Sequence, residues 1–204
     1  MLSGGFGVTE FQLVLLRRMA DYQPLLVERA RNRLGASRSD MRAANARWQA
    51  LIRSRRFPSG LRRFRLVLGP PGAETERRVG DLACQVCCWP LPLWPDLLFE
   101  VLAGPDGTVL GSWLVRPPGT PMPSLIGRAD LTPWSCVVSD VDAAFPPAEH
   151  REGSAPSRWT VAFNAPDGAG RPVPLLGHFV WGLLQTVEEA PLRTGAQAGE
   201  SRSR

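Results

Sequence analysis

The spacing of apolar residues changes about a third of the way along this 204-residue chain, and this change limits the folds that it can adopt. Up to about residue 60, apolar residues recur every three or four positions, which is the period of an amphipathic helix. Beyond that point, short runs rich in Val, Leu and Trp are separated by turns containing Gly, Pro and Asp, a pattern typical of β-strands. Helices are therefore expected first and strands later.

Local signals place three helices in the first part of the chain. Residues 9–12 (Thr-Glu-Phe-Gln) match a capping box at the start of the first helix. Pro24 either kinks this helix or is the first residue of the next one. Ser37 or Ser39 caps a third helix, which is predicted over residues 40–56.

The rest of the chain carries strand and turn signals. Single strands are predicted over residues 62–68, 79–89 and 135–141. Two hairpins are predicted around the turns Gly-Pro-Asp-Gly at 104–107 and Ala-Pro-Asp-Gly at 165–168. Residues 178–188 fit either a strand or a short helix.

This order of elements favours an α+β protein, with N-terminal basic helices followed by an antiparallel β-sheet or a sandwich-like body. Repeated strand–helix–strand units, which would indicate a parallel sheet, are absent from the sequence pattern. We predict a basic helical region at 1–60, a β-rich body at 61–189 and a disordered tail at 190–204.

Charge is divided unevenly along the chain. Residues 1–66 contain fourteen Arg and four acidic residues, a balance of +10, whereas residues 67–204 contain ten Arg and fifteen acidic residues, a balance of −5. A basic segment attracts anionic partners. It could equally form ion pairs with the acidic part of its own chain.

The third predicted helix and the residues after it carry the Arg side chains best placed to bind a partner. The candidate surface consists of Arg42, Arg47, Arg53, Arg55 and Arg56. An Arg stripe on helices is also how non-specific nucleic-acid binding arises. Aromatic residues do not alternate with these Arg residues in the way expected of a base-stacking platform, and a solvated helix face is the simpler interpretation.

The run Trp-Pro-Leu-Pro-Leu-Trp-Pro at 89–95 is a second candidate partner site. Its prolines impose an extended backbone, from which Trp89 and Trp94 would project toward a partner. The alternative is a wide connection between two strands, whose Trp rings fill the ends of the core.

A zinc site is the candidate metal centre. Cys84, Cys87 and Cys136, with His150 or His178, would supply the four sulfur and nitrogen ligands that zinc prefers. However, Cys84 and Cys87 would point to opposite faces of a strand. Buried free cysteines that pack as small apolar residues are the alternative.

Two carboxylates, Asp140 and Asp142, would share one face of the strand predicted at 135–141. Paired carboxylates can hold a divalent cation or act in acid–base chemistry. A polar, solvent-facing strand edge explains them as well.

The sequence contains no phosphate-binding loop and no nucleophile motif. We therefore expect a non-enzymatic cytoplasmic interaction or regulatory protein, which binds an acidic protein partner through its basic helical arm and needs no cofactor. A nucleic-acid-binding protein using the same Arg residues is one alternative, and a metal-dependent or hydrolytic enzyme is another. No apolar run approaches the ~20 residues needed to span a bilayer, and the sequence leaves the oligomeric state open.

Overall fold

The structure, a computed structural model, describes residues 5–191. Within this range the chain forms four helices, then two antiparallel four-stranded sheets with a further α-helix between them in sequence, which confirms the predicted α+β class. Of the predicted tail, residues 192–204 lie outside the described range.

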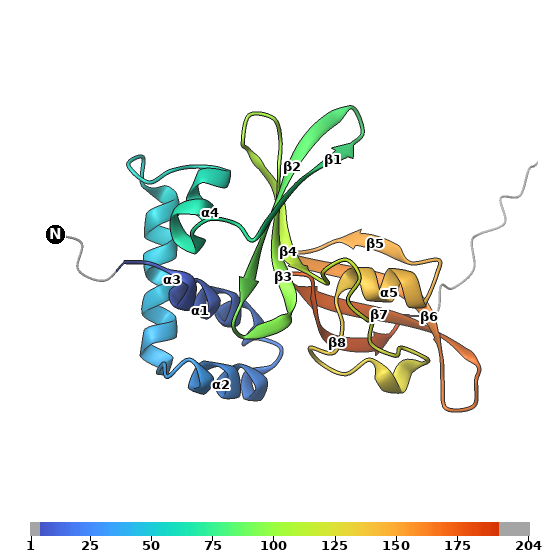
Figure 1. Cartoon of the computed structure of the whole chain (residues 1–204). Coiled ribbons are helices and arrows are strands. Elements are labelled where there is room, and N and C mark those ends of the chain that lie inside the picture. Colours follow the sequence, from blue (N-terminus) through green and yellow to red (C-terminus); the bar gives the residue numbers. More distant parts are fainter. Residues whose placement is uncertain (1–4, 192–204) are drawn as a thin grey trace, which may run out of the picture.

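The first four helices are α1 (Val8–Met19), α2 (Pro24–Arg33), α3 (Arg38–Arg53) and α4 (Leu61–Leu68). Sheet A follows, with its strands side by side in chain order: β1 (Ala73–Val79), β2 (Leu82–Leu91), β3 (Trp94–Ala103) and β4 (Val109–Val115). A short 3-10 helix, η1 (Arg128–Asp130), and helix α5 (Val138–Ala144) lead to sheet B. Its strands are also in chain order: β5 (Glu149–Glu152), β6 (Arg158–Pro166), β7 (Pro172–Val180) and β8 (Leu183–Glu189). Figure 1 shows the helices on one side, sheet A in the middle and sheet B with α5 beyond it.

The start of α1 differs from the prediction. Gly7 is the N-cap residue, and its backbone N–H donates a hydrogen bond of 2.9 Å to the Glu10 carboxylate. Gln12, predicted to complete a capping box with Thr9, is buried instead. Its side-chain oxygen accepts a hydrogen bond of 2.8 Å from the backbone N–H of Leu93. A tertiary contact therefore uses the side chain that the local pattern assigned to the cap.

The starts of α2 and α3 agree with the local signals. Pro24 is the first residue of α2, where its missing N–H leaves no helical bond unmade. Ser37 caps α3, because its hydroxyl accepts from the Asp40 N–H at 3.1 Å while the Asp40 carboxylate accepts from the Ser37 N–H at 2.7 Å. Helix α3 ends at Arg53, before the predicted end at residue 56.

The strand predicted over 62–68 is wrong, since these residues lie in helix α4. Its buried positions are Leu61, Phe64, Val67 and Leu68, a spacing that places them on one face of a helix. Leu66, which made the sequence appear to alternate, is 61% exposed. In a stretch of eight residues, the helical period of 3.6 and the strand period of 2 are hard to distinguish. Burial against the core decides between helix and strand.

The strand predicted over 135–141 is also wrong. Val137 makes only an isolated bridge to Leu183, and the chain then enters α5. The Asp140 carboxylate accepts a hydrogen bond of 3.0 Å from the Val137 N–H, which satisfies one of the free donors at the helix start. Both predicted hairpins form, as β3–β4 and β6–β7. Residues 178–188 complete β7, turn at Trp181 and Gly182, and return as β8.

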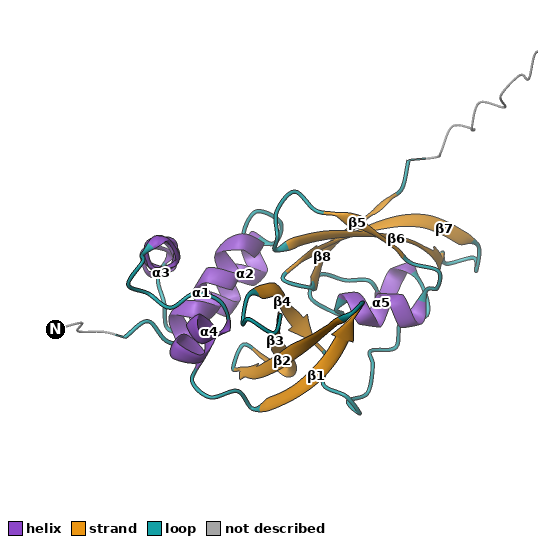
Figure 2. Ribbon diagram, turned by 90° about the horizontal axis from the view of Figure 1, so that it is seen from above, coloured by secondary structure: helices purple, strands orange, loops and turns teal. Residues whose placement is uncertain are grey.

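One apolar core joins the four N-terminal helices to sheet A. It includes Phe11 of α1, Trp48 of α3, Phe64 of α4 and Phe99 of β3. Rings of Phe11, Phe64 and Phe99 contact each other with centroids 5.0–6.0 Å apart. Figure 2 shows the helices gathered against sheet A. The boundary predicted at residue 60 therefore falls within a shared core.

A second core lies between α5 and sheet B. It contains Val141 and Phe145 of α5, packed with Phe163 of β6 and Phe179 of β7. The rings of Phe145 and Phe163 are stacked with centroids 5.5 Å apart. Adjacent residues of β8 belong to different cores, because Leu183 packs in the first and Leu184 in the second.

The turn between β7 and β8 connects the two halves. Trp181 and Gly182 have positive φ angles of 52° and 75°. The Trp181 carbonyl accepts a hydrogen bond of 2.7 Å from Leu114 of β4, and the Gly182 carbonyl accepts one of 3.1 Å from Val138 of α5. The turn thus fixes sheet B and α5 against the edge of sheet A. Among the described residues, no helix combines the length and apolar character needed to cross a membrane.

Candidate partner-binding surface

Few ion pairs join the N-terminal region to the acidic residues between 67 and 191. Within residues 5–191, only two ion pairs join residues 1–66 to the rest of the chain. Arg65 holds the Glu74 carboxylate through two hydrogen bonds of 2.8 and 2.9 Å, and Asp21 pairs with Arg158 at 2.9 Å. The other ion pairs of this region are internal, and two of them share Glu28.

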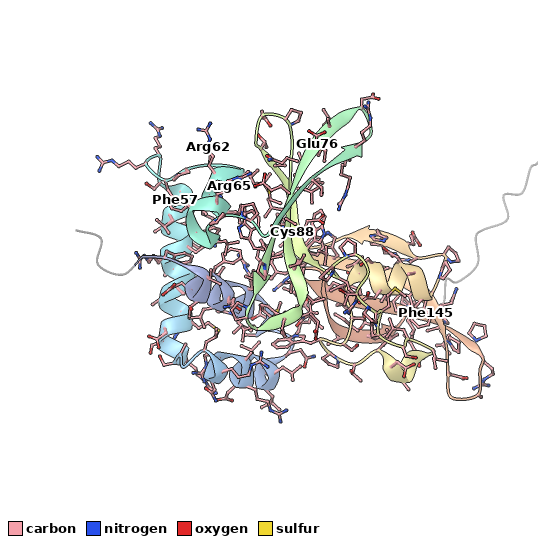
Figure 3. The ribbon with its side chains drawn as sticks, viewed as in Figure 1. Phe57, Arg62, Arg65, Glu76, Cys88 and Phe145 are labelled. Carbon is pink, nitrogen blue, oxygen red and sulfur yellow. The ribbon has the colours of Figure 1, made fainter. Side chains whose placement is uncertain are left out.

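An exposed set of Arg residues remains along α3, in the loop after it and at the start of α4. We define the arginine surface as Arg42, Arg53, Arg55, Arg56 and Arg62. All five are exposed, and none forms an ion pair with another residue between 5 and 191. Figure 3 shows Arg62 pointing away from the helices at this corner. Arg47, also predicted, lies over the ring of Phe6 at 6.0 Å.

Packing beneath the arginine surface holds its loop in place. Phe57, in the loop between α3 and α4, contacts Trp48 with ring centroids 6.5 Å apart. The Arg63 guanidinium lies 5.9 Å from the Trp48 ring, and its Nε donates a hydrogen bond of 3.2 Å to the Pro58 carbonyl. Burial lowers the pKa of Arg63. The exposed Arg side chains therefore project from a supported backbone.

A cavity adjoins this surface on the side of sheet A. It has a volume of about 810 Å³ and lies between α4 and the β3–β4 turn, with Arg62, Arg63 and Asp106 among its lining residues. The two walls meet where the Leu61 N–H donates a hydrogen bond of 2.9 Å to the Gly107 carbonyl. The arginine surface is thus continuous with a hollow.

The predicted projection of Trp89 and Trp94 toward a partner is wrong. Trp89 is 2% exposed, and its Nε1–H donates a hydrogen bond of 2.9 Å to the Gly69 carbonyl. Trp94 is buried against Trp134, with ring centroids 6.0 Å apart. The run at 89–95 forms the end of β2, a turn and the start of β3. Its turn is held by Gln12, and by Arg33, whose guanidinium donates a hydrogen bond of 2.8 Å to the Leu93 carbonyl.

The candidate zinc ligands are not brought together. Cys87 lies in the core beneath the helices, Cys84 in a small cluster on the other face of sheet A, and Cys136 in the core of sheet B. His150 is exposed on β5 and pairs with Asp142. No group of three or more metal-ligating side chains occurs among the residues that the structure describes. A site built from these four residues is therefore wrong, because β2 turns Cys84 and Cys87 to opposite faces.

Three of the four thiols are in apolar surroundings that disfavour the thiolate. Burial raises the pKa of Cys136 to about 12 and that of Cys88 to about 11. Burial also raises the pKa of Cys87, which the nearby Arg65 lowers in part. Reactive cysteines have a lowered pKa, so these three are in environments typical of structural thiols.

The two carboxylates predicted to share a strand face have separate roles on α5. Asp140 is buried and accepts hydrogen bonds of 2.9 Å from both the Nε and an Nη of Arg116. Asp142 pairs with His150 at 2.8 Å. Sequence analysis missed both pairs, because the Arg116–Asp140 pair spans twenty-four positions and neither spacing forms a motif. A third missed pair joins Arg77 to the buried Glu100 across sheet A.

Comparisons with known proteins identify no family. No family model and no curated protein matches the chain. One solved structure with partial similarity is that of a candidate beta-lactamase inhibitor protein from Streptococcus mutans. It aligns with 66% of this chain and 83% of its own, at 10% identity and a TM-score of 0.28. A likeness at this level supports no conclusion about the fold or the function of this chain.

Proposed function

We propose that this protein is a non-enzymatic interaction protein that binds an acidic surface of a protein partner through the arginine surface. The observation that supports this proposal is the exposed, unpaired state of Arg42, Arg53, Arg55, Arg56 and Arg62 within residues 5–191. Guanidinium groups bind carboxylates through paired hydrogen bonds. Because the acidic residues between 5 and 191 form no ion pair with these groups, an external anion is their natural partner.

The nature of the surface favours a protein over a single-stranded nucleic acid. Base binding requires exposed aromatic rings between the basic groups. The aromatic rings next to the arginine surface, Trp48, Phe57 and Phe64, are engaged with one another in the core. Binding to the phosphates of a duplex needs no such rings. Duplex DNA is therefore the alternative ligand that an experiment must exclude.

The ionisable groups in the interior support binding rather than catalysis. The buried carboxylates of Glu100 and Asp140 are each held by an Arg fork. The raised pKa values of Cys88 and Cys136 keep both thiols protonated near neutral pH. These groups are therefore occupied in maintaining the fold.

Charge reversal of the arginine surface tests the proposal. The triple variant Arg53→Glu, Arg55→Glu, Arg56→Glu is compared with a control triple that has the same charge change at exposed positions elsewhere: Arg78→Glu, Arg151→Glu, Arg171→Glu. Fluorescence anisotropy measures binding of a labelled short polyglutamate peptide and of a labelled DNA duplex. We expect the first triple to weaken polyglutamate binding at least about tenfold, or about 1.4 kcal/mol, and the control to change it far less.

Two outcomes would overturn the proposal. Equal weakening by both triples would mean that net charge, and not this surface, governs binding. Tighter binding of the duplex than of polyglutamate, with log affinity falling by about 0.9 per phosphate contacted per tenfold rise in salt, would assign the surface to nucleic acid instead. Circular dichroism of each variant confirms that the helices are retained.

A further inference from the structure

A separate cavity lies where the two halves of the molecule meet, away from the arginine surface. It has a volume of about 290 Å³, close to the lower end of the range of about 300–1,000 Å³ for small-molecule pockets. Its walls come from the end of β4, helix α5, β5, the start of β6 and the β7–β8 turn. The surface of the cavity is mainly apolar, with a few polar groups at one side.

Two Trp rings form a corner of this cavity. Trp113 of β4 and Trp159 of β6 have centroids 6.1 Å apart and ring planes at 84° to each other. The ring of Trp113 lies over Gly111, where a Cβ atom would be only 2.0 Å from a ring carbon. The absence of a side chain at Gly111 therefore fixes the position of one wall. Trp159 packs against the core of sheet B, which fixes the other.

A carboxylate faces the same cavity. Oδ1 of Asp142 is 2.8 Å from Nε2 of His150, and both side chains are lining residues. The Asp142 side chain is 37% exposed, and its second oxygen has no hydrogen-bond partner among residues 5–191. This side of the cavity can therefore still accept a hydrogen bond or face a positive charge.

No Arg side chain among residues 5–191 lines the cavity, although two Arg residues are close in sequence to its walls. Arg116 follows the lining residue Val115, but its guanidinium is held by Asp140. Arg158 precedes Trp159, but it pairs with Asp21 at 2.9 Å and lies over the ring of Tyr22 at 5.5 Å. The guanidinium groups of Arg116 and Arg158 are thus directed away from the cavity.

We propose that this cavity binds a small organic cation that carries a quaternary ammonium group. Perpendicular aromatic faces with a nearby carboxylate are the arrangement that attracts such ions, because the negative faces of the rings complement a charge that is spread over methyl groups. A ligand with a carboxylate would be repelled by Asp142. A neutral hydrocarbon would offer no complementary charge to the partly exposed Asp142 carboxylate.

Choline and its neutral carbon isostere, 3,3-dimethylbutan-1-ol, distinguish a cation site from an apolar pocket. Binding to the full chain is followed by NMR of the Trp indole N–H groups. We expect choline to saturate in the millimolar range, with the largest shifts at the indoles of Trp113 and Trp159. We expect the isostere to bind about tenfold more weakly, as the loss of a cation–π contact and its ionic partner implies.

The variant Asp142→Asn keeps the shape of the side chain and removes its charge. It should weaken choline binding by about threefold to tenfold, in the range for a partly exposed charge, and leave binding of the isostere unchanged. Glu149→Gln, at an exposed carboxylate of β5 that does not line the cavity, is the matched control and should bind choline normally. The Arg53→Glu, Arg55→Glu, Arg56→Glu triple should also bind choline normally, because this site does not depend on the proposed partner surface.

Three results would overturn the inference. Equal affinity for choline and its isostere would show that charge is not recognised. Choline shifts that do not saturate, or that are largest at other Trp residues, would show that the cavity is not the site. Unchanged choline affinity in Asp142→Asn would remove the carboxylate from the recognition.

Discussion

Asp140 and Arg116 place opposite charges inside the second half of the molecule. The Asp140 side chain is 2% exposed and that of Arg116 is 14% exposed, so water screens the pair little. The hydrogen bonds that Arg116 donates to Asp140 raise the pKa of Arg116, which remains charged at any accessible pH. The same carboxylate caps the start of α5 through the Val137 N–H. A single side chain therefore supports both a helix start and a buried cation.

Replacing Asp140 with Asn should destabilise the protein strongly. The change keeps an oxygen for the Val137 N–H but removes the carboxylate that holds the largely buried Arg116 guanidinium, leaving Asp96 as the remaining nearby acid. Removing one partner of a buried ion pair costs about 3–5 kcal/mol, and urea unfolding should show a loss of this size. Glu149→Gln breaks the exposed pair with Arg151 and should cost about 0–1 kcal/mol. Losses of similar size in the two variants would contradict this account.

Among the connections between elements, the start of α4 depends on a close backbone approach. Gly60 has a φ angle of 60°, and a Cβ atom at this position would lie 2.2 Å from the Gly107 carbonyl oxygen. Gly80, in the turn between β1 and β2, has a similar φ of 58° but open space around its Cβ position. Both glycines therefore adopt a left-handed backbone conformation, but only Gly60 also lies against another backbone segment.

Alanine at Gly60 and at Gly80 should separate these two effects. Gly80→Ala should lower the free energy of unfolding by about 1–2 kcal/mol, because alanine must adopt the left-handed backbone conformation there. Gly60→Ala has the same cost and must also displace α4 from the β3–β4 turn, which adds about 1–3 kcal/mol. Chemical denaturation of both variants measures the difference. Equal stabilities would show that α4 and the turn move apart freely.

Across the whole molecule, sheet A has no core of its own beneath the helices. Its buried residues Trp89, Leu91 and Phe99 belong to the same cluster as Phe11, Leu15 and Trp48 of the helices. Strand β1 is exposed along its full length and adds little apolar burial. We therefore expect sheet A to be stable only when the helices cover it.

A chain shortened to residues 70–191 should not retain the native sheet A. Without the helices, the large rings of Trp89 and Phe99 would face water, at about 25 cal/mol for each Å² of apolar surface exposed. We expect this chain to bind an apolar dye and to lose protection of the β2 and β3 amides in hydrogen exchange. Native-like protection of β2 and β3 in the shortened chain would show that the sheet folds independently.

The sequence by itself determined the class of fold and several element boundaries. The signals that succeeded act over a few residues: Pro24 and Ser37 at helix starts, and the Gly-Pro-Asp-Gly and Ala-Pro-Asp-Gly segments in hairpin turns. Such signals are reliable because caps and turns are satisfied by atoms of neighbouring residues. The basic character of the first part of the chain was evident from composition alone.

Only the tertiary structure decided which side chains face the solvent. Residues 62–68 form a helix because a helix buries Phe64 and Val67. Trp89 and Trp94 lie in the core because Gln12 and Arg33 hold the turn between them. The arginine surface and the cavity between Trp113 and Trp159 arise in the same way, from contacts between residues far apart in sequence. Burial and ion pairing depend on which elements contact each other in the folded protein, and a local sequence pattern does not specify those contacts.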